Sequence, residues 1–485
     1  MKRLIRISAY AVGVLAVCAA IAAWQFRPPA PLKPAATEFV LREVTLINPG
    51  RSREAHKILG VRGDRIAAIA EGVNAPGGDA ADLAAYRGMY VLPGLIDMHT
   101  HLPPGNPLKL TSYFMLLNIA HGVTTVRDAA DLDGTALAAR AQAERDGYPG
   151  PRTFYCNAFV SAGPPEWANE ITLRAPEDAE IAVQKLKAGG ASCVKAYDGL
   201  TLPLLDTLRR AADRNGLALI GHVPDVLSYE EALLPDVQHM MGIAPRMPGG
   251  HLMLSDGWDR VDDARLRQIV GVTLQHHMAN TPTLVIGQQV LLLESYERNK
   301  DAPQVALAPR MYRDAVWNPD GGLWKYRGMT SEDFARLRTA QEKKLRLARM
   351  LFEAGAQLYL GTDTQQPFVI AGQALQQEMR LFAKAGIPIE ATWEIGTRQS
   401  AAALGIPQGG TIEVGAPADL LIFREDPTKS LDALDSLQAV VLQGRLYTRE
   451  SLDAKVREYQ AHFNGFVFDR LSTVLAKAAL RKAIH

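Results

Sequence analysis

Six residues that can bind a metal ion stand at or just after the ends of strand-like runs in this 485-residue chain. They are His99, His101, Lys195, His222, His239 and Asp363. Residues two apart on a strand point to the same side, so the imidazoles of His99 and His101 can converge on one ion. An isolated His-x-His pair is more often two ordinary loop histidines, and the metal interpretation therefore depends on the other four residues.

Strand-like runs alternate with longer helical runs between about Pro93 and Gln408, which is typical of βα units around a parallel sheet. The strand-like runs are Val91–Met98, Val123–Val126, Arg152–Val160, Ser192–Tyr197, Leu217–His222, Val237–His239, Met278–Leu284 and Leu358–Leu360. Eight such runs predict an α/β fold, a (β/α)8 TIM barrel, in which catalytic residues stand at the carboxyl ends of the strands. The six metal-capable residues would then share one face.

Lys195 is the unusual member of this set, because a protonated amine is repelled by metal cations. Burial and nearby positive charge both lower the pKa of a lysine. A neutral amine can take up carbon dioxide and become an anionic carbamate, whose two oxygens can bridge two metal ions. The alternative is an ordinary lysine paired with Asp198 or with a substrate carboxylate.

Short strand-like runs flank the barrel region on both sides and predict one small β-sandwich built from both chain ends. Gly410–Gly415 and Asp419–Phe423 are two of the expected returning strands. We therefore divide the chain into an N-terminal segment (1–34), a first sandwich part (35–92), the barrel (93–408), a second sandwich part (409–450) and a helical C-terminal tail (451–485). The sequence does not reveal a role for this tail.

Three basic residues among the first six precede an uncharged apolar run, Ile7–Phe26. This pattern is typical of an export signal, and Ala20-Ile21-Ala22 offers a small-x-small cleavage site. The run is also about as long as the ~20 residues that span a bilayer, so an uncleaved membrane anchor is nearly as well supported. Both alternatives place the protein outside the cytoplasm, either in the periplasm or anchored to the membrane.

The composition limits the classes of partner that the protein can bind. A formal net charge of +1 and the absence of a basic stripe or zinc-finger pattern argue against nucleic acid. We expect a small-molecule or dipeptide substrate and a homo-oligomer. Cys156 and Cys193 are the cysteines of the body of the chain. Two buried free thiols are the expected state, and one disulfide is the alternative.

The motifs together resemble the amidohydrolase superfamily with two metal ions, in particular its imidazolonepropionase-like and prolidase-type members. The resemblance extends over about residues 38–447. It rests on Val91–Leu102, Gly122–Asp128, Val194-Lys195, Gly221–Pro224, Gln238-His239, Thr281–Leu284, Gly361–Asp363 and Gly410–Phe423. Gln238 stands where many relatives carry Glu.

This resemblance implies a binuclear site. The first metal would be held by His99, His101, Lys195 and Asp363. The second would be held by Lys195, His222 and His239, with a carboxylated Lys195 bridging the two ions. Zinc suits imidazole and carboxylate ligands. Water between two divalent ions becomes hydroxide-like near neutral pH, and Asp363 would accept its proton and pass it to the leaving amine.

Three further residues near strand ends carry two interpretations each. Tyr197 faces the same side as Lys195, so its phenol either binds a substrate carbonyl or carboxylate or simply packs at the rim. Arg127 could grip a substrate carboxylate, but an internal salt bridge is the preferred interpretation. Asp97 lies among apolar residues and should accept backbone hydrogen bonds, as a supporting and not a catalytic group.

The leading functional hypothesis is a metal-dependent hydrolase that cleaves a C–N amide bond in a dipeptide or an N-acyl amino acid. A lactonase, a phosphoester hydrolase or a ring deaminase could use the same metal site. A non-catalytic envelope binding protein is the alternative from another class, and the intact ligand set argues against it.

Overall fold

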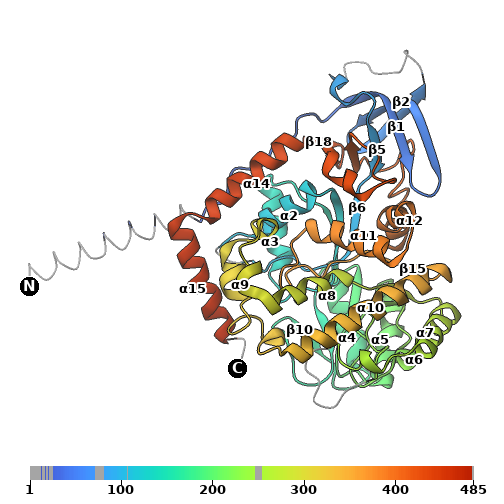
Figure 1. The fold of residues 1–485 in the computed structure, drawn as a ribbon, viewed down its shortest axis with the longest axis vertical. Coiled ribbons are helices and arrows are strands. Elements are labelled where there is room, and N and C mark those ends of the chain that lie inside the picture. Colours follow the sequence, from blue (N-terminus) through green and yellow to red (C-terminus); the bar gives the residue numbers. More distant parts are fainter. Residues whose placement is uncertain are drawn as a thin grey trace, which may run out of the picture.

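Two groups of strands organise the protein in the computed structural model (Figure 1). The structure describes Gly13, Val17, Ala20 and residues 26–71, 81–105, 108–245 and 254–482. Parallel strands occupy the middle of the molecule, and a separate sheet lies at the upper end in Figure 1.

Eight parallel strands form the central group. They are β6 (Leu95–Thr100), β7 (Val123–Asp128), β8 (Arg152–Tyr155), β11 (Cys193–Ala196), β12 (Ala218–Gly221), β13 (Asp236–Gln238), β14 (Ala279–Thr281) and β15 (Gln357–Leu358). Two short extra strands, β9 (Phe159–Ser161) and β10 (Glu170–Thr172), extend the sheet beside β11. Backbone hydrogen bonds from Ser192 to Tyr155 and from Met98 to Leu360 join the two sheets at both seams. The result is a TIM-barrel-like domain.

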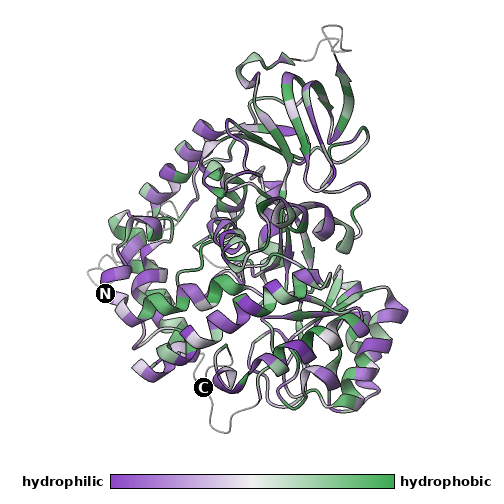
Figure 2. Ribbon diagram, turned by 45° about the vertical axis from the view of Figure 1, so that its right-hand side comes forward, coloured by the Kyte–Doolittle hydropathy of each residue, from purple (hydrophilic) through white to green (hydrophobic). Residues whose placement is uncertain are grey.

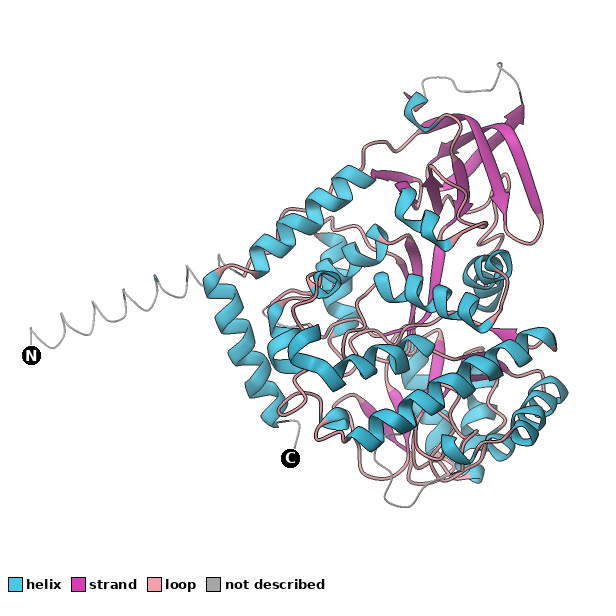
Figure 3. Ribbon diagram, viewed as in Figure 1, coloured by secondary structure: helices cyan, strands magenta, loops and turns pink. Residues whose placement is uncertain are grey.

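Helices surround these strands, as Figure 3 shows. They are α2 (Thr111–Ala120), α3 (Ala136–Arg145), α4 (Asp178–Ala188), α5 (Leu202–Asn215), α6 (Tyr229–Ala232), α7 (Asp263–Gln275), α8 (Leu284–Val290), α9 (Tyr296–Asn299), α10 (Ser331–Glu353), α11 (Gln373–Ala385), α12 (Ile389–Glu394) and α13 (Ser400–Ala403). The outer helices carry both hydrophilic and hydrophobic residues (Figure 2). This pattern follows from burying one face of each helix against the sheet.

The upper sheet joins both chain ends. Its order is β18-β17-β16-β5-β1-β2-β3, with β4 paired to β1. The strands are β1 (Phe39–Asn48), β2 (Ser52–Arg62), β3 (Arg65–Glu71), β4 (Ala81–Asp82), β5 (Tyr90–Pro93), β16 (Leu420–Phe423), β17 (Leu437–Leu442) and β18 (Arg445–Thr448). One residue separates β5 from the first barrel strand, β6. The two chain ends therefore share a sheet, while its two-layer sandwich form stays a prediction.

Two predicted strands differ in the structure. Gly410–Gly415 is not a strand, because Gly415 turns the chain at φ 88°. The segment crosses the end of β3, where the backbone N–H of Gly415 donates to the carbonyl of Ile66. The run Arg152–Val160 is interrupted after Tyr155, where Asn157 adopts φ 68°, and it forms two separate strands, β8 and β9.

The prediction of two free thiols was wrong, because Cys156 and Cys193 form a disulfide. Cys156 directly follows β8 and Cys193 begins β11, so the bond fastens two neighbouring barrel strands. The cysteines are 37 residues apart in sequence, and closing a loop of that length stabilises the fold by about 4 kcal/mol in the chain-entropy model.

The C-terminal tail forms two helices, α14 (Arg449–Phe463) and α15 (Phe466–Lys482), which run along one flank of the molecule (Figure 1). The hydroxyl of Tyr459 on α14 donates to Ser112 Oγ on α2, and Tyr459 also packs on Tyr113. The tail is thus held against the barrel.

The predicted signal or anchor segment lies almost wholly outside the described residues, so both alternatives stay predictions. No helix in the described parts of the chain is both long and apolar enough to span a membrane.

Lys344 on α10 provides a test of the cost of a buried cation. Its side chain is buried beside the ring of Trp258, 5.3 Å from the ring centroid, and burial lowers the pKa of Lys344 to about 7. We expect Lys344→Met to raise the free energy of unfolding at pH 7 by about 1–3 kcal/mol, because an apolar group replaces a poorly solvated charge. Urea denaturation measures the difference.

The pH dependence follows from the depressed pKa. Between about pH 7 and 10.5 the unfolded lysine holds a proton that the folded one lacks, so the stability of the natural protein rises with pH and the advantage of the variant shrinks. Lys343→Met is the matched control, because Lys343 donates to the carbonyls of Trp258 and Asp259. It should lower stability, and equal effects of the two variants would contradict the explanation.

Candidate metal centre

The structure brings all six predicted residues together. His99 lies near the end of β6 and His101 follows that strand; Lys195 is in β11. His222 and His239 directly follow β12 and β13, and Asp363 comes after β15. All six side chains are buried and line a single cavity of about 690 Å³. In such barrels the catalytic residues stand at the carboxyl ends of the parallel strands, which accounts for this convergence.

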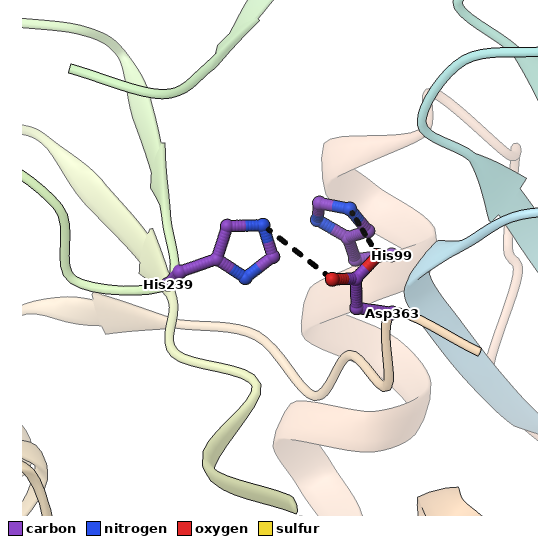
Figure 4. Close-up of side chains that lie close together, drawn as sticks. All are labelled: His99, His239 and Asp363. Carbon is purple, nitrogen blue, oxygen red and sulfur yellow. Dashed lines mark ion pairs between the residues drawn. The ribbon is translucent and has the colours of Figure 1, made fainter. Parts of the chain in front are cut away.

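Asp363 lies at the centre of the cluster (Figure 4). Its Oδ1 is 3.0 Å from His101 Nε2 and 3.5 Å from His99 Nε2, and its Oδ2 is 4.0 Å from His239 Nε2. The ligand atoms of His99, His239 and Asp363 all lie within 4.8 Å of one another, which makes these residues a candidate metal-binding triad. The rings of His222 and His239 are 5.0 Å apart, so His222 extends the cluster away from Asp363.

In three of the histidines, a hydrogen bond fixes Nδ1, the ring nitrogen that is not directed at Asp363. His99 Nδ1 donates to Gln238 Oε1, and His101 Nδ1 donates to the carbonyl of Ala130. The hydroxyl of Thr283 donates to the carbonyl of Pro282, which leaves its oxygen to accept from His239 Nδ1. Each Nε2 therefore faces Asp363, and such outer partners are what orient ligating histidines.

Buried polar atoms without partners indicate what the site is built to hold. Among the described residues, His99 Nε2, Lys195 Nζ and His222 Nδ1 are buried and have no hydrogen-bond partner. An unsatisfied buried donor or acceptor costs about 1–3 kcal/mol, so three in one cluster call for an explanation. Divalent cations would satisfy these atoms, and the donor set of imidazoles and a carboxylate fits zinc. Lys195 makes no ion pair with Asp198 among the described residues, so the simple pairing alternative lacks support.

Burial controls the charges of the cluster. It lowers the pKa of His99 to about 3 and holds the pKa values of His222 and His239 well below the usual value, so these imidazoles are neutral. Burial alone would raise the pKa of Asp363, but the nearby imidazoles of His101 and His99 hold it well below its usual range. Burial also lowers the pKa of Lys195 to about 7. Neutral imidazoles and an ionised carboxylate are the forms that bind metals.

Two glycines allow the ligand strands to approach closely. A Cβ on Gly221, which has φ 154° and precedes His222, would lie 2.2 Å from the carbonyl oxygen of Ala196 on β11. A Cβ on Gly361 would lie 2.9 Å from the Cβ of His99. Asp363 and His239 adopt φ values of 53° and 60°, uncommon for residues other than glycine and typical of functional sites.

Asp97 and Arg127 behave as supporting residues, as the sequence predicted. Asp97 accepts hydrogen bonds from the backbone N–H of His99 and Thr362 and from the hydroxyl of Thr362, so it ties the segments that carry His99 and Asp363. Arg127 forms a buried ion pair with Asp236 and is therefore engaged inside the protein.

The cavity wall contains residues that the sequence did not single out. Lys325 Nζ is 3.1 Å from Glu166 Oε1 and 5.0 Å from the ring centroid of Trp167. Tyr197 is buried among them, and its oxygen accepts from Trp167 Nε1 and Lys325 Nζ. Glu166 and Lys325 come from long connections, where side-chain type alone does not indicate position.

Gln238 is the outer partner that the sequence marked as a departure from related proteins. We expect Gln238→Leu to weaken metal binding by about 10- to 100-fold, because His99 Nδ1 loses the acceptor that fixes its ring. Zinc titration by calorimetry measures the loss. Gln238→Glu, which restores an acceptor, should bind nearly as well as the natural protein.

Gln289→Leu removes another buried glutamine, which bonds Gln377 and does not line the cavity, and it serves as the matched control. If Gln238→Leu and Gln289→Leu bind zinc alike, the orienting role is wrong.

Comparison with known proteins agrees with this geometry. The model of the amidohydrolase family matches residues 90–447. The bottromycin amidohydrolase structure is 22% identical with TM-score 0.67, over 90% of this chain and 92% of that one. A Xaa-Pro dipeptidase with bound methionine is 17% identical with TM-score 0.63, over 85% and 100% of the two chains. A putative prolidase from Bifidobacterium longum is 22% identical with TM-score 0.62, over 88% and 100%.

These structural similarities show the fold. An N-acyl-D-aspartate deacylase from Alcaligenes xylosoxydans xylosoxydans is 37% identical over 93 residues, which are 19% of this chain and only 18% of that relative's length. The family match, in contrast, extends over most of the chain and includes every residue of the cluster. The chain therefore belongs to the amidohydrolase family.

Proposed function

We propose that the protein hydrolyses the amide bond of a small substrate, a dipeptide or an N-acyl amino acid. The observation that carries the proposal is the buried cluster of His99, His101, His239 and Asp363, whose Nε2 atoms face one carboxylate while partners fix the Nδ1 atoms of the histidines. A site with this donor set and several unpartnered atoms is suited to metal ions and not to structural hydrogen bonding.

Two divalent ions, zinc in our proposal, would be divided between the ligands as the resemblance implies. His99, His101, Lys195 and Asp363 would hold one, and Lys195, His222 and His239 would hold the other, with Lys195 carboxylated. The low pKa of Lys195 and its lack of a hydrogen-bond partner among the described residues support carboxylation. Bound ions would acidify water and polarise the scissile carbonyl.

The protein's own groups would manage protons and substrate. Asp363 is ionised and can accept a proton, which it can then pass to the leaving amine. Burial raises the pKa of Tyr197, so its phenol stays neutral, and because its oxygen already accepts two hydrogen bonds, its O–H is available to a substrate carbonyl or carboxylate. Lys325, which is paired with Glu166, lies beside that position.

We also propose that the protein acts outside the cytoplasm. The basic start and the apolar run Ile7–Phe26 support export. The Cys156–Cys193 disulfide supports an oxidising compartment, because such bonds are rare in the cytosol. Membrane anchoring and a homo-oligomeric state stay predictions.

Metal analysis together with a substrate screen tests the proposal. Purified protein should contain about two divalent ions per chain and should lose activity on chelation and regain it with zinc. Dipeptides, N-acyl amino acids, lactones and phosphoesters should be screened in parallel with zinc-loaded protein. Activity confined to lactones or phosphoesters, or full activity in metal-free protein, would overturn it.

A further inference from the structure

The C-terminal helix forms part of the wall of the metal-site cavity. Four residues of α15, namely Leu475, Ala476, Ala479 and Leu480, line the cavity that contains the histidine cluster. The sequence had given the tail no role. All four side chains are apolar, so the tail contributes a hydrophobic surface to the site and no chemistry.

This wall is held in place by several contacts. α15 packs against the π-helical turn η5 (Tyr312–Val316), and Asp469 on α15 lies 3.7 Å from Arg310 just before that turn. Phe468 is buried and packs on Phe26 and Phe463. A loosely attached tail would not make both an ion pair and an aromatic cluster with the rest of the protein, so α15 is a fixed boundary of the cavity.

Polar groups of the cavity gather at the metal end. Gln366 Nε2 donates to Asp363 Oδ2, and Gln365 Nε2 donates to the carbonyl of His101. The hydroxyl of Tyr312 on η5 donates to Gln365 Oε1, which places η5 between the metal end and α15.

Beyond that hydrogen bond, the wall towards α15 includes Met311, Leu475 and Leu480. The cavity thus changes from polar to apolar along the path from Asp363 to α15, which matches a ligand with a reactive polar head and an apolar tail.

Size and exposure agree with such a ligand. The cavity volume of about 690 Å³ is within the ~300–1,000 Å³ range of ligand pockets. Leu475 lines the cavity and is nevertheless 45% exposed, so the cavity reaches the surface beside α15. An apolar chain that extends from the metal centre would therefore run along α15 towards this opening.

We propose that the cavity binds amides with a long apolar acyl chain, and that α15 is the wall that holds this chain. The inference rests on the proposed amide hydrolysis and narrows its substrate to N-acyl amino acids with fatty acyl groups. The scissile amide would lie at the metal centre, with the amino-acid carboxylate near Lys325 and the acyl chain against α15. Small dipeptides would leave the apolar part of the cavity unfilled.

The first experiment compares N-acetyl-, N-hexanoyl- and N-dodecanoyl-alanine as substrates of the zinc-loaded enzyme. Burying a methylene group strengthens binding by up to about fourfold, so kcat/KM for the dodecanoyl compound should exceed that for the acetyl compound by at least 100-fold. In parallel, calorimetry measures the binding of dodecanoate, below its micelle concentration, to the full-length protein without added metal.

Ala476→Phe tests the wall directly, because Ala476 is buried and faces the cavity. The larger ring should lower dodecanoate affinity at least tenfold and reduce the ratio of dodecanoyl to acetyl kcat/KM. Ala478→Phe is the matched control, since Ala478 is exposed on the same helix and does not line the cavity. Leu475→Asn is a second variant, at a half-exposed position where the fold tolerates a polar group. It should weaken dodecanoate binding several-fold.

The outcomes separate the two proposals. Dodecanoate binding that Ala476→Phe weakens, with no hydrolysis of any N-acyl alanine, would support the acyl-chain site and count against amide hydrolysis. Hydrolysis with no preference for chain length, or dodecanoate binding that neither Ala476→Phe nor Leu475→Asn changes, would overturn the acyl-chain site while amide hydrolysis stands.

Discussion

Replacing Asp363 with asparagine is expected to lower kcat/KM at least 1,000-fold. The carboxylate faces three imidazoles, at 3.0 and 3.5 Å through Oδ1 and at 4.0 Å through Oδ2. An amide keeps the shape but loses the negative charge and cannot take up a proton, and general acid–base groups contribute about 10²- to 10⁴-fold on their own. The measurement is kcat/KM for the best substrate of the screen, together with zinc content per chain.

Asp419→Asn is the control for this prediction. Asp419 is a half-buried carboxylate that directly precedes β16, where it accepts a hydrogen bond from the backbone of Gln443. That variant should keep its activity within about twofold even if it unfolds at a lower temperature. A variant Asp363→Asn that retains more than a tenth of the natural activity would show that another group moves the proton.

Replacing Lys195 with alanine should have a comparable effect, through metal content. If a carboxylated lysine bridges two ions, its loss leaves the second ion with only the two imidazoles of His222 and His239. We therefore expect about one bound zinc per chain and at least a 1,000-fold loss of kcat/KM. Lys344→Met is the control, because Lys344 is also buried with a pKa of about 7 but does not line the cavity. Metal content by mass spectrometry and kinetics measure both effects.

The dependence of activity on carbon dioxide distinguishes carboxylation of Lys195 from a simple structural role. Metal-free protein that is reloaded with zinc in buffer free of carbon dioxide should recover little activity, and bicarbonate should restore it. Recovery that is equal with and without bicarbonate would indicate that Lys195 acts as an uncarboxylated amine.

The convergence of the six residues on one cavity could be predicted from the sequence, because it depends on two regular features. Alternation along a strand places His99 and His101 together, and parallel strands deliver His222, His239 and Asp363 to one face. The supporting role of Asp97 followed from the cost of burying an unpaired carboxylate. The alternation along a strand is a local rule, and the gathering of strand ends at one face follows from the barrel fold without knowledge of individual contacts.

The features that the sequence did not predict depend on contacts between distant segments. The Cys156–Cys193 disulfide requires the start of β11 to lie beside the end of β8, and cysteine type alone does not reveal that. Lys325 reaches Glu166 and Tyr197 only because a long connection folds over the cavity. Among the tryptophans of such connections, Trp324 lines the cavity whereas Trp258 is buried elsewhere, a difference that tertiary packing decides.

The upper sheet also constrains how the polypeptide is made. β5 pairs with β1 on one side and with β16 on the other, so its second edge stays open during translation until Leu420–Phe423 has left the ribosome. Both Val91 and Leu92 on β5 are fully buried in the finished protein. An open edge of this kind is prone to aggregation, so a nascent chain that lacks its last strands should depend on chaperones and would not behave as a smaller enzyme.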